Sequence, residues 1–351
     1  MSFDDARAVI ARAIDARTFP AAAMEVGSAA GKIWSDTIGT LTFDRGAAPA
    51  TESTIFDLAS LTKAIATTTV MMELVRTGAV SLDARVAEFF IDWRGDDREA
   101  VTVRDLLEHA SGLPARLVDQ PPDTRREFEH EIGTIKLEYA PRTRSIYSDL
   151  GFLLLGFLAA DVGGAPLDAL FERIAVRLKP ATAEGRVAGQ GDPGLVYTVP
   201  PLLRTLAAPT EPMDVDPRRG RRLIGEVHDN YAAALGGVAG HAGVFGTAAA
   251  VGAFAQTLLV GGEMVRLFTT RTTVPGSSRA LGWDTMLPTS SCGTGMSPRA
   301  FGHVGFTGTS LWIDPARDRY FVLLTNRVCR GGTLDQMRDA RRAFHDALAG
   351  V

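Results

Sequence analysis

The stretch that decides the fold reads Phe56-Asp57-Leu58-Ala59-Ser60-Leu61-Thr62-Lys63 and leads into an apolar run that ends at Gly78. Ser60 and Lys63 are three residues apart, and residues at this spacing share one face of a helix. The Lys63 amine can therefore reach the Ser60 hydroxyl, as in an activated serine nucleophile. Residues 62–77 are mostly apolar residues and threonines, which predicts a buried helix with Ser60 at its amino end, where free backbone N–H groups favour negative charge.

Further helical and strand patterns lie along the rest of the chain. Apolar residues at helical spacing predict helices, and short runs rich in apolar and β-branched residues predict strands. The expected helices are 3–17, 62–77, 102–109, 151–162, 166–178, 248–259 and 334–348, and the expected strands are 22–27, 32–43, 302–313 and 320–326. The irregular, proline-containing stretch 181–230 is expected to border an active site or to be mobile.

The order of these elements predicts the fold class. Strands near both ends of the chain, with helices between them, indicate an α/β (α+β) fold. Residues 1–79 and 241–351 are predicted to form a discontinuous α/β domain with a central antiparallel sheet. Residues 80–240 are predicted to form a mainly helical domain whose loops border the active-site cleft.

Composition excludes several classes of function. The formal net charge is −4 and the arginines are dispersed except at 218–222, so we expect no nucleic-acid partner. The apolar runs fall short of the roughly 20 residues that a bilayer requires, so we expect no membrane span. The amino terminus does not resemble a signal peptide, which predicts a cytoplasmic location, or a periplasmic one if a leader has been removed. Cys292 and Cys329 are expected to be free thiols.

Three further motifs follow the first in sequence: Leu106-Leu107-Glu108-His109-Ala110-Ser111-Gly112-Leu113-Pro114, Tyr147-Ser148-Asp149-Leu150-Gly151 and Gly302-His303-Val304-Gly305-Phe306-Thr307-Gly308. With them the chain resembles the serine β-lactamase and penicillin-binding-protein superfamily, in its class C-like branch. The resemblance implies a β-lactamase/transpeptidase-like fold, an antiparallel sheet flanked by helices with an inserted, mainly helical domain. A fifth block, 225–229 with 240–243, is similar to a subgroup of serine hydrolases in that branch.

The resemblance also implies roles for individual residues. Ser60 would be the nucleophile. Lys63, with its amine pKa lowered in a partly apolar pocket, and Tyr147 would accept and return the proton of the Ser60 hydroxyl. Which of the two is the general base stays open. The backbone N–H groups of Ser60 and Phe306 would form the oxyanion hole. No cofactor and no metal ion are implied.

Two departures from the family pattern bear on the substrate. His303-Val304-Gly305 stands where β-lactamases of this branch have Lys-Thr-Gly, so a fixed cation and a hydroxyl that help to hold a substrate carboxylate are missing. Asp149 stands where the family has an asparagine, so an amide donor is lost. Both departures favour ester or amide hydrolysis over efficient β-lactam hydrolysis.

His228, Asp229 and His241 form an ambiguous set. Two imidazoles and a carboxylate resemble metal ligands, but their spacing fits no compact helical metal site. A role in the substrate pocket and a role in loop-stabilising hydrogen bonds are the other interpretations, and we place these residues with the substrate-binding set. His109 and Ser111 are interpreted as structural.

These observations predict a cofactor-free serine hydrolase that forms an acyl-enzyme on a small ester or amide, such as a muropeptide-like cell-wall fragment. A class C-like β-lactamase is the enzymatic alternative. A catalytically inert binding or scaffold protein is the alternative from another class, and retention of Ser60, Lys63 and Tyr147 counts against it. The chain is expected to be a monomer or a weak homo-oligomer.

Overall fold

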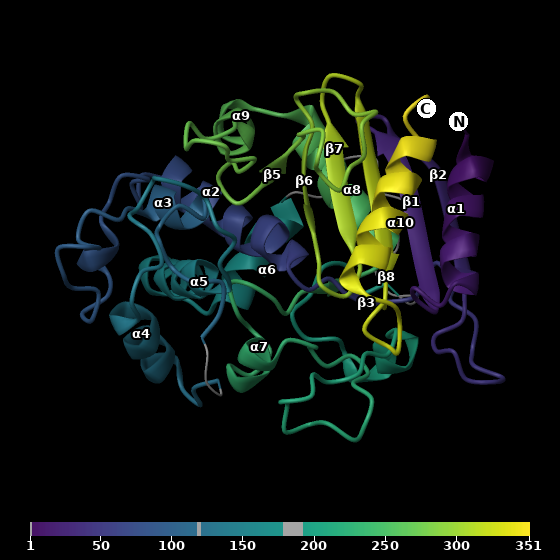
Figure 1. Cartoon of the computed structure of the whole chain (residues 1–351), viewed down its shortest axis with the longest axis horizontal. Helices are drawn as coiled ribbons and strands as arrows, with labels where there is room; N and C mark the ends of the chain where they lie inside the picture. Colours follow the sequence, from purple (N-terminus) through teal and green to yellow (C-terminus); the bar gives the residue numbers. More distant parts are fainter. Residues whose placement is uncertain (1, 118–120, 178–191) are drawn as a thin grey trace.

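A six-stranded antiparallel sheet forms one side of the molecule in the computed structural model, which describes residues 2–117, 121–177 and 192–351. Its strand order is β2-β1-β8-β7-β6-β5 (Figure 1). The strands are β1 (Ala21–Ser28), β2 (Gly31–Gly39), β5 (Asp284–Thr285), β6 (Phe301–Val304), β7 (Ser310–Asp314) and β8 (Arg319–Thr325). Because β1 pairs with β8, the first and last parts of the chain build one sheet.

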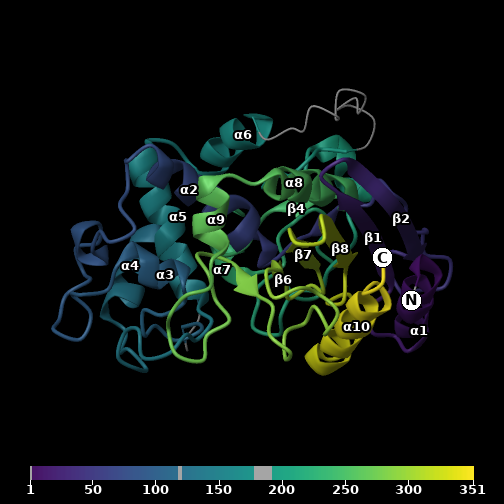
Figure 2. The same ribbon diagram turned by 90° about the horizontal axis from the view of Figure 1, so that it is seen from above.

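Helices cover both faces of this sheet. On one face, α1 (Phe3–Asp15) and α10 (Leu334–Ala347) pack against each other and share a hydrophobic cluster with the strands. On the other face, α8 (Ala248–Val260) packs against β1, β7 and β8. Every residue of β1 is buried, as expected for a strand with a layer on each side. The two chain ends lie side by side (Figures 1 and 2).

The remaining helices gather beside the sheet, away from β1 and β2 (Figure 2). They are a π-helical turn (Lys63–Thr67), α2 (Thr68–Arg76), α3 (Val103–Leu107), α4 (Arg125–Thr134), α5 (Asp149–Gly163), α6 (Leu167–Arg177), α7 (Asn230–Ala234) and α9 (Glu263–Thr269), with 3-10 turns at Val86–Glu88 and Pro201–Leu206. The first eleven residues of α5 are buried, and this helix packs against α2, α3 and α6. A two-stranded pair, β3 (Phe56–Asp57) with β4 (Phe245–Gly246), leads directly to Ser60.

Most expected elements are present, with shifted ends. The strand expected at 302–313 is wrong, because it is two strands, β6 and β7, separated by a turn over 305–309. The strand expected at 32–43 ends earlier, at Gly39, whose φ of 90° breaks the extended conformation. The helices α4, α7 and α9 and the short strands β3, β4 and β5 were not anticipated. Residue 178 of the expected helix 166–178 and residues 181–191 of the irregular stretch 181–230 lie outside the described residues. The division into two domains stays a prediction.

Two other expectations concern cysteines and membrane spans. Cys292 and Cys329 are free and buried, which confirms them as thiols. In the part of the chain that the structure describes, no single helix is long and apolar enough to cross a bilayer. The pairs Asp149–Gly163 with Leu167–Ala175, and Ala248–Val260 with Glu263–Thr269, meet the criteria of length and composition only together, and they are bent by 75° and 106°.

Candidate active site

Ser60 sits in a tight turn just before the first buried helix. The residue before it, Ala59, has a φ of 48°, a left-handed conformation that costs roughly 1–3 kcal/mol for a residue with a Cβ. The Ala59 N–H donates to Asp57 Oδ1 at 2.8 Å. The hydroxyls of Thr307 and Thr309, in the turn between β6 and β7, donate to the carbonyls of Asp57 and Leu58 at 2.8 and 3.0 Å. These bonds hold the strained turn in place.

Ser60, Lys63 and Tyr147 meet as the sequence predicted. Lys63 Nζ lies 3.0 Å from Ser60 Oγ, and the Tyr147 hydroxyl lies 2.7 Å from the same oxygen. Lys63 is fully buried and also donates to the carbonyl of His241 at 2.9 Å. Tyr147 directly precedes Ser148, the residue that caps α5. The serine oxygen is thus in contact with both candidate proton carriers.

The expected lowering of the Lys63 pKa is wrong. Burial by itself would lower it, but Asp149 Oδ1 lies 2.7 Å from Lys63 Nζ, and the attraction of this carboxylate raises the pKa of Lys63 above its ordinary value. Burial and the charge of Asp149 also raise the pKa of Tyr147, against the opposing effect of Lys63. In the resting site we therefore expect a charged amine beside a neutral phenol.

Asp149 belongs to a network of charges that includes Arg116, which the sequence analysis did not single out. Arg116 Nη1 lies 2.9 Å from Asp149 Oδ2 and 2.8 Å from Asp229 Oδ2. Asp229 Oδ1 in turn lies 2.7 Å from His241 Nε2. Burial acts to raise the pKa values of both carboxyls, but in Asp149 the charge of Lys63, and in Asp229 the interactions with His241 and Arg116, hold them below their usual range. Arg116 follows the Gly112-Leu113-Pro114 turn, and this position carried no local signal for such a role.

A metal ion does not suit this network. Ligand atoms of Asp149, Asp229 and His241 lie within 4.8 Å of one another, a spacing that could hold an ion. However, Arg116 already bonds to both carboxylates and Lys63 to one of them. A metal would have to displace the guanidinium and would repel the adjacent ammonium.

The two backbone groups predicted for the oxyanion hole have no competing partner within the described ranges. Neither the Ser60 N–H nor the Phe306 N–H donates a hydrogen bond there. The Phe306 carbonyl, by contrast, accepts from Arg327 Nη2 at 2.7 Å, and the Gly305 carbonyl accepts from the buried Arg341. These arginines fix the orientation of the turn after β6.

His303 lies at this end of β6 but does not replace the family's cation. Its ring centroid is 6.2 Å from that of Tyr147, and Nδ1 lies 2.9 Å from the Val304 carbonyl. Burial, aided by the charges of Arg279 and Lys63, keeps the pKa of His303 well below its usual range. The His109 ring centroid lies 4.9 Å from that of Tyr147, and the pKa of His109 is also well below its usual range. Its Nδ1 accepts the Ser148 N–H at 3.1 Å, as a structural residue would.

The predicted trio of His228, Asp229 and His241 is split. Asp229 and His241 bond to each other in the charge network, whereas the His228 ring stacks beside Phe306 with centroids 5.7 Å apart. Burial lowers the pKa of His228 to about 4. The His228 N–H donates to Asp57 Oδ2 at 2.7 Å, so it is tied to the nucleophile turn.

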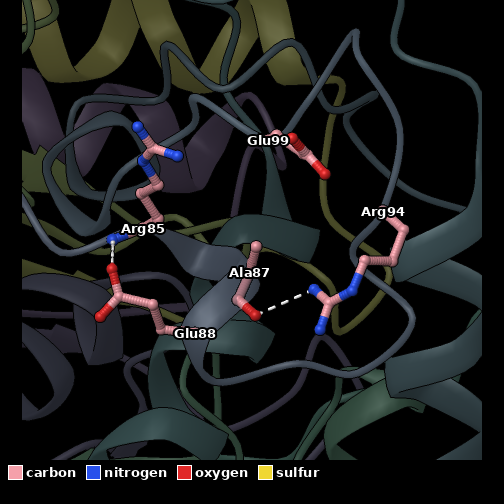
Figure 3. Close-up of a pocket in the computed structure, with 5 residues that line it drawn as sticks. All are labelled: Arg85, Ala87, Glu88, Arg94 and Glu99. Carbon is pink, nitrogen blue, oxygen red and sulfur yellow. Dashed lines mark hydrogen bonds between the residues drawn. The ribbon is translucent and has the colours of Figure 1, made fainter.

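Two cavities differ in their relation to these residues. One of about 520 Å³ borders the candidate site and is lined by Glu211, Pro212, Met213, Asp214, His228, Phe306, Arg327, Val328, Arg330 and Gly331. The other, of about 400 Å³, is lined by Arg85, Ala87, Glu88, Arg94 and Glu99 (Figure 3). None of the second set is a candidate site residue, whereas the first cavity includes His228 and Phe306.

Comparison with known proteins identifies the family of the chain. Residues 6–345 match the family model described as Beta-lactamase. A putative D-alanyl-D-alanine carboxypeptidase of Escherichia coli (strain K12) is 34% identical over 325 residues, which covers 79% of this chain and 70% of the relative. A protein of the same description from Salmonella typhi is 32% identical over 324 residues, with the same coverage.

Solved structures show the same fold at low sequence identity. A class C β-lactamase from Rhodobacter sphaeroides has a TM-score of 0.73 and 19% identity over 98% of each chain. EstCE1, a hydrolase with promiscuous acyltransferase activity, has a TM-score of 0.71 and 20% identity over 97% of this chain and 98% of its own. These neighbours confirm the predicted β-lactamase/transpeptidase-like fold.

Fold and relatives together define a serine hydrolase. The chain belongs to the Beta-lactamase family, within the superfamily of serine β-lactamases and penicillin-binding proteins.

Proposed function

We propose that Ser60 is the nucleophile of an acyl-enzyme mechanism, and that the enzyme cleaves a small ester or amide such as a cell-wall peptide fragment. The observation that carries the proposal is the pair of short contacts at Ser60 Oγ, to Lys63 and to Tyr147. The substrate class is supported by the relatives described as putative D-alanyl-D-alanine carboxypeptidases.

The charges suggest the order of proton transfers. In the resting site both Lys63 and Tyr147 carry protons, and both can donate to Ser60 Oγ. Loss of one proton from this coupled group creates the base that accepts the serine proton during attack. Tyr147, in direct contact with Ser60 Oγ, then returns a proton to the leaving group. Free N–H groups of Ser60 and Phe306 face the developing oxyanion in this scheme.

β-Lactam hydrolysis is the second candidate, and the site favours it less. The oxygens of Asp149 are engaged by Lys63 and Arg116, so this residue offers no donor to the acylamido group of a penicillin or cephalosporin. Val304 supplies no hydroxyl on β6. The pKa of His303 is well below its usual range, so its ring carries no charge near pH 7.

The test is a burst experiment with p-nitrophenyl acetate on the wild type and on Ser60→Ala. We expect a stoichiometric burst and an acetyl group on Ser60 by mass spectrometry, both absent in Ser60→Ala and retained in Ser81→Ala, a matched change of an exposed serine. An unlabelled Ser60 in folded wild-type protein would favour an inert binding protein instead.

Nitrocefin on the same samples separates the two enzymatic candidates. Slow or absent hydrolysis supports the ester and amide proposal, and fast turnover that depends on Ser60 would make β-lactamase the better description.

Cell fractionation tests the cytoplasmic location, which stays a prediction.

A further inference from the structure

The peptide between Gly305 and Phe306 carries one of the two N–H groups of the proposed oxyanion hole. In the proposed function, on which this inference rests, attack of Ser60 Oγ forms a bond to the substrate carbonyl carbon and moves the carbonyl π electrons onto oxygen. The peptide is trans, so its N–H and its C=O point in opposite directions. Whatever binds the Gly305 carbonyl therefore lies behind the Phe306 N–H, on the side away from the oxyanion.

The buried side chain of Arg341 occupies that position. It comes from α10, is 6% exposed, and its Nη2 donates to the carbonyls of Gly305 and Thr309 at 2.5 and 3.0 Å. Its Nε donates to the carbonyl of Gly308 at 3.3 Å. The guanidinium thus holds three carbonyls of the turn over 305–309, and one of them belongs to the oxyanion-hole peptide.

Arg341 has no acidic partner to neutralise its charge. Within the described parts of the chain, no carboxylate lies within ion-pair distance of its guanidinium, and its hydrogen bonds go to backbone carbonyls. Arg327, whose Nη2 binds the Phe306 carbonyl at 2.7 Å, also faces no carboxylate there. Burial and the charge of Arg327 lower the pKa of Arg341 to about 9, so the side chain is still charged near pH 7. A buried charge without a counter-ion is costly, and a neutral donor could bind the same carbonyls.

Neutral contacts hold this turn against the nucleophile turn without the help of a charge. Two threonine hydroxyls within it donate to the carbonyls of Asp57 and Leu58 at 2.8 and 3.0 Å. A Cβ added at Gly305 would lie only 2.6 Å from the Leu58 carbonyl oxygen, so the two turns pack closely. Because these contacts already place the Phe306 N–H, the charge of Arg341 calls for an electrostatic explanation.

We propose that the charge of Arg341 strengthens the Phe306 N–H as a donor to the oxyanion, which makes Arg341 a positioning residue for acylation. A cation bonded to a carbonyl polarises the peptide and makes its N–H a stronger donor. By ordinary peptide and hydrogen-bond lengths, the charge lies about 7–8 Å from the place of the oxyanion, and buried surroundings screen it weakly. Since the substrate carbonyl is neutral before attack, the effect belongs to the transition state and not to substrate binding.

Replacements of Arg341 that separate charge from hydrogen bonding test this proposal. Arg341→Gln keeps N–H donors and loses the charge, whereas Arg341→Lys keeps the charge and loses the planar fork. In stopped-flow experiments with p-nitrophenyl acetate, we expect Arg341→Gln to lower the acylation rate constant by about 10- to 100-fold, with substrate affinity within about threefold, and Arg341→Lys to keep most of the rate. Arg342→Gln is the matched control, because Arg342 is the next residue on α10 and binds the carbonyls of Pro288 and Ser290 instead.

A spectroscopic measurement on Ser60→Ala protein keeps the test independent of turnover. Labelling glycine with ¹³C at the carbonyl and phenylalanine with ¹⁵N selects the three Gly-Phe peptides of the chain, of which two lie in α5 and the third is Gly305-Phe306. Loss of the charge in Arg341→Gln should move the ¹⁵N resonance of Phe306 to lower frequency, and Arg341→Lys should move it less. The two peptides in α5 are internal controls and should not change.

Two outcomes would overturn the role of Arg341. One is an equal loss of acylation rate in Arg341→Gln and Arg341→Lys, and the other is a Phe306 resonance that stays in place in Arg341→Gln. If Arg341→Gln does not fold, Arg341→Met takes its place with the same expectations, because a buried site accepts an apolar residue of similar length. Failure of the wild type to acylate Ser60 would count against the proposed function, and the Phe306 resonance would still decide whether Arg341 polarises the peptide.

Discussion

Replacing Asp149 with asparagine should destabilise the protein and change the pH at which it works. The substitution keeps the size of the side chain and introduces the amide of the family pattern. It removes the carboxylate that lies 2.7 Å from Lys63 and 2.9 Å from Arg116. Arg116 keeps Asp229 as a partner at 2.8 Å, whereas Lys63 loses its carboxylate and keeps neutral partners that include the Ser60 hydroxyl and the His241 carbonyl.

The magnitude follows from burial. Lys63 is fully buried and the Asp149 side chain is 10% exposed, and removing one partner of a buried ion pair costs about 3–5 kcal/mol. Asp149, with its pKa below 3.8, stabilises the fold above that pH, and this contribution is lost as the pH falls. Lys63, with its pKa above 10.5, contributes below that value and loses its contribution as the pH rises further. The difference in stability is therefore greatest between about pH 5 and about pH 9.

Urea unfolding of both proteins at pH 3, 7 and 10 measures this difference. Asp161→Asn is the matched control, because Asp161 is also an arginine-paired aspartate on α5 but is 53% exposed; it should cost less than about 1 kcal/mol. Without Asp149, burial of Lys63 is no longer opposed, so its pKa should fall and the acidic limb of the kcat/KM profile should move to lower pH. A loss below about 1 kcal/mol at pH 7, or an unmoved limb, would refute the assigned role of this ion pair.

Three further results are expected. Tyr147→Phe should lower kcat with p-nitrophenyl acetate by about 10²- to 10⁴-fold while thermal unfolding changes little, because the phenol acts on the proton of Ser60; activity within threefold of the wild type would exclude it as acid or base. Asp57→Asn should cost about 1–3 kcal/mol in urea unfolding, because both oxygens of Asp57 accept backbone N–H groups and an amide can accept at only one, and an unchanged midpoint would contradict this. Burial raises the pKa values of Cys292 and Cys329 to about 12 and about 11, so both thiols should react with a disulfide reagent at pH 8 only after unfolding, and rapid labelling of folded protein would show that a thiol is accessible.

Local patterns were sufficient where the physical cause is local. The serine and lysine three residues apart lie on one face of a helix because helix geometry alone brings them together. Thr102 caps α3, and its hydroxyl accepts the Asp105 N–H at 3.3 Å, a local bond between residues three apart at the start of the helix expected over 102–109. The turn within 302–313 was missed because β6 and β7 have similar apolar and β-branched residues and were taken as one strand. Only the glycines between them indicate that the chain turns back.

The pKa of Lys63 could not be obtained in this way. Burial of the helix is visible in the apolar pattern and predicts a lowered pKa. The opposing carboxylate of Asp149 is 86 positions away in sequence, and whether it lies at 2.7 Å or merely nearby decides the direction of the shift. The prediction was wrong because it included desolvation and left out the charge.

The sequence by itself indicated the family, the candidate nucleophile with its two candidate proton carriers, and the departures on β6 and at Asp149, because these are identities and spacings within short motifs. Only the tertiary structure decided that Arg116 joins Asp149 to Asp229, that His228 separates from His241, and that Arg279 stands beside Tyr147. Electrostatic effects fall off with distance in space rather than along the chain. The charge of a site therefore depends on which loops fold over it, and a linear pattern does not contain that information.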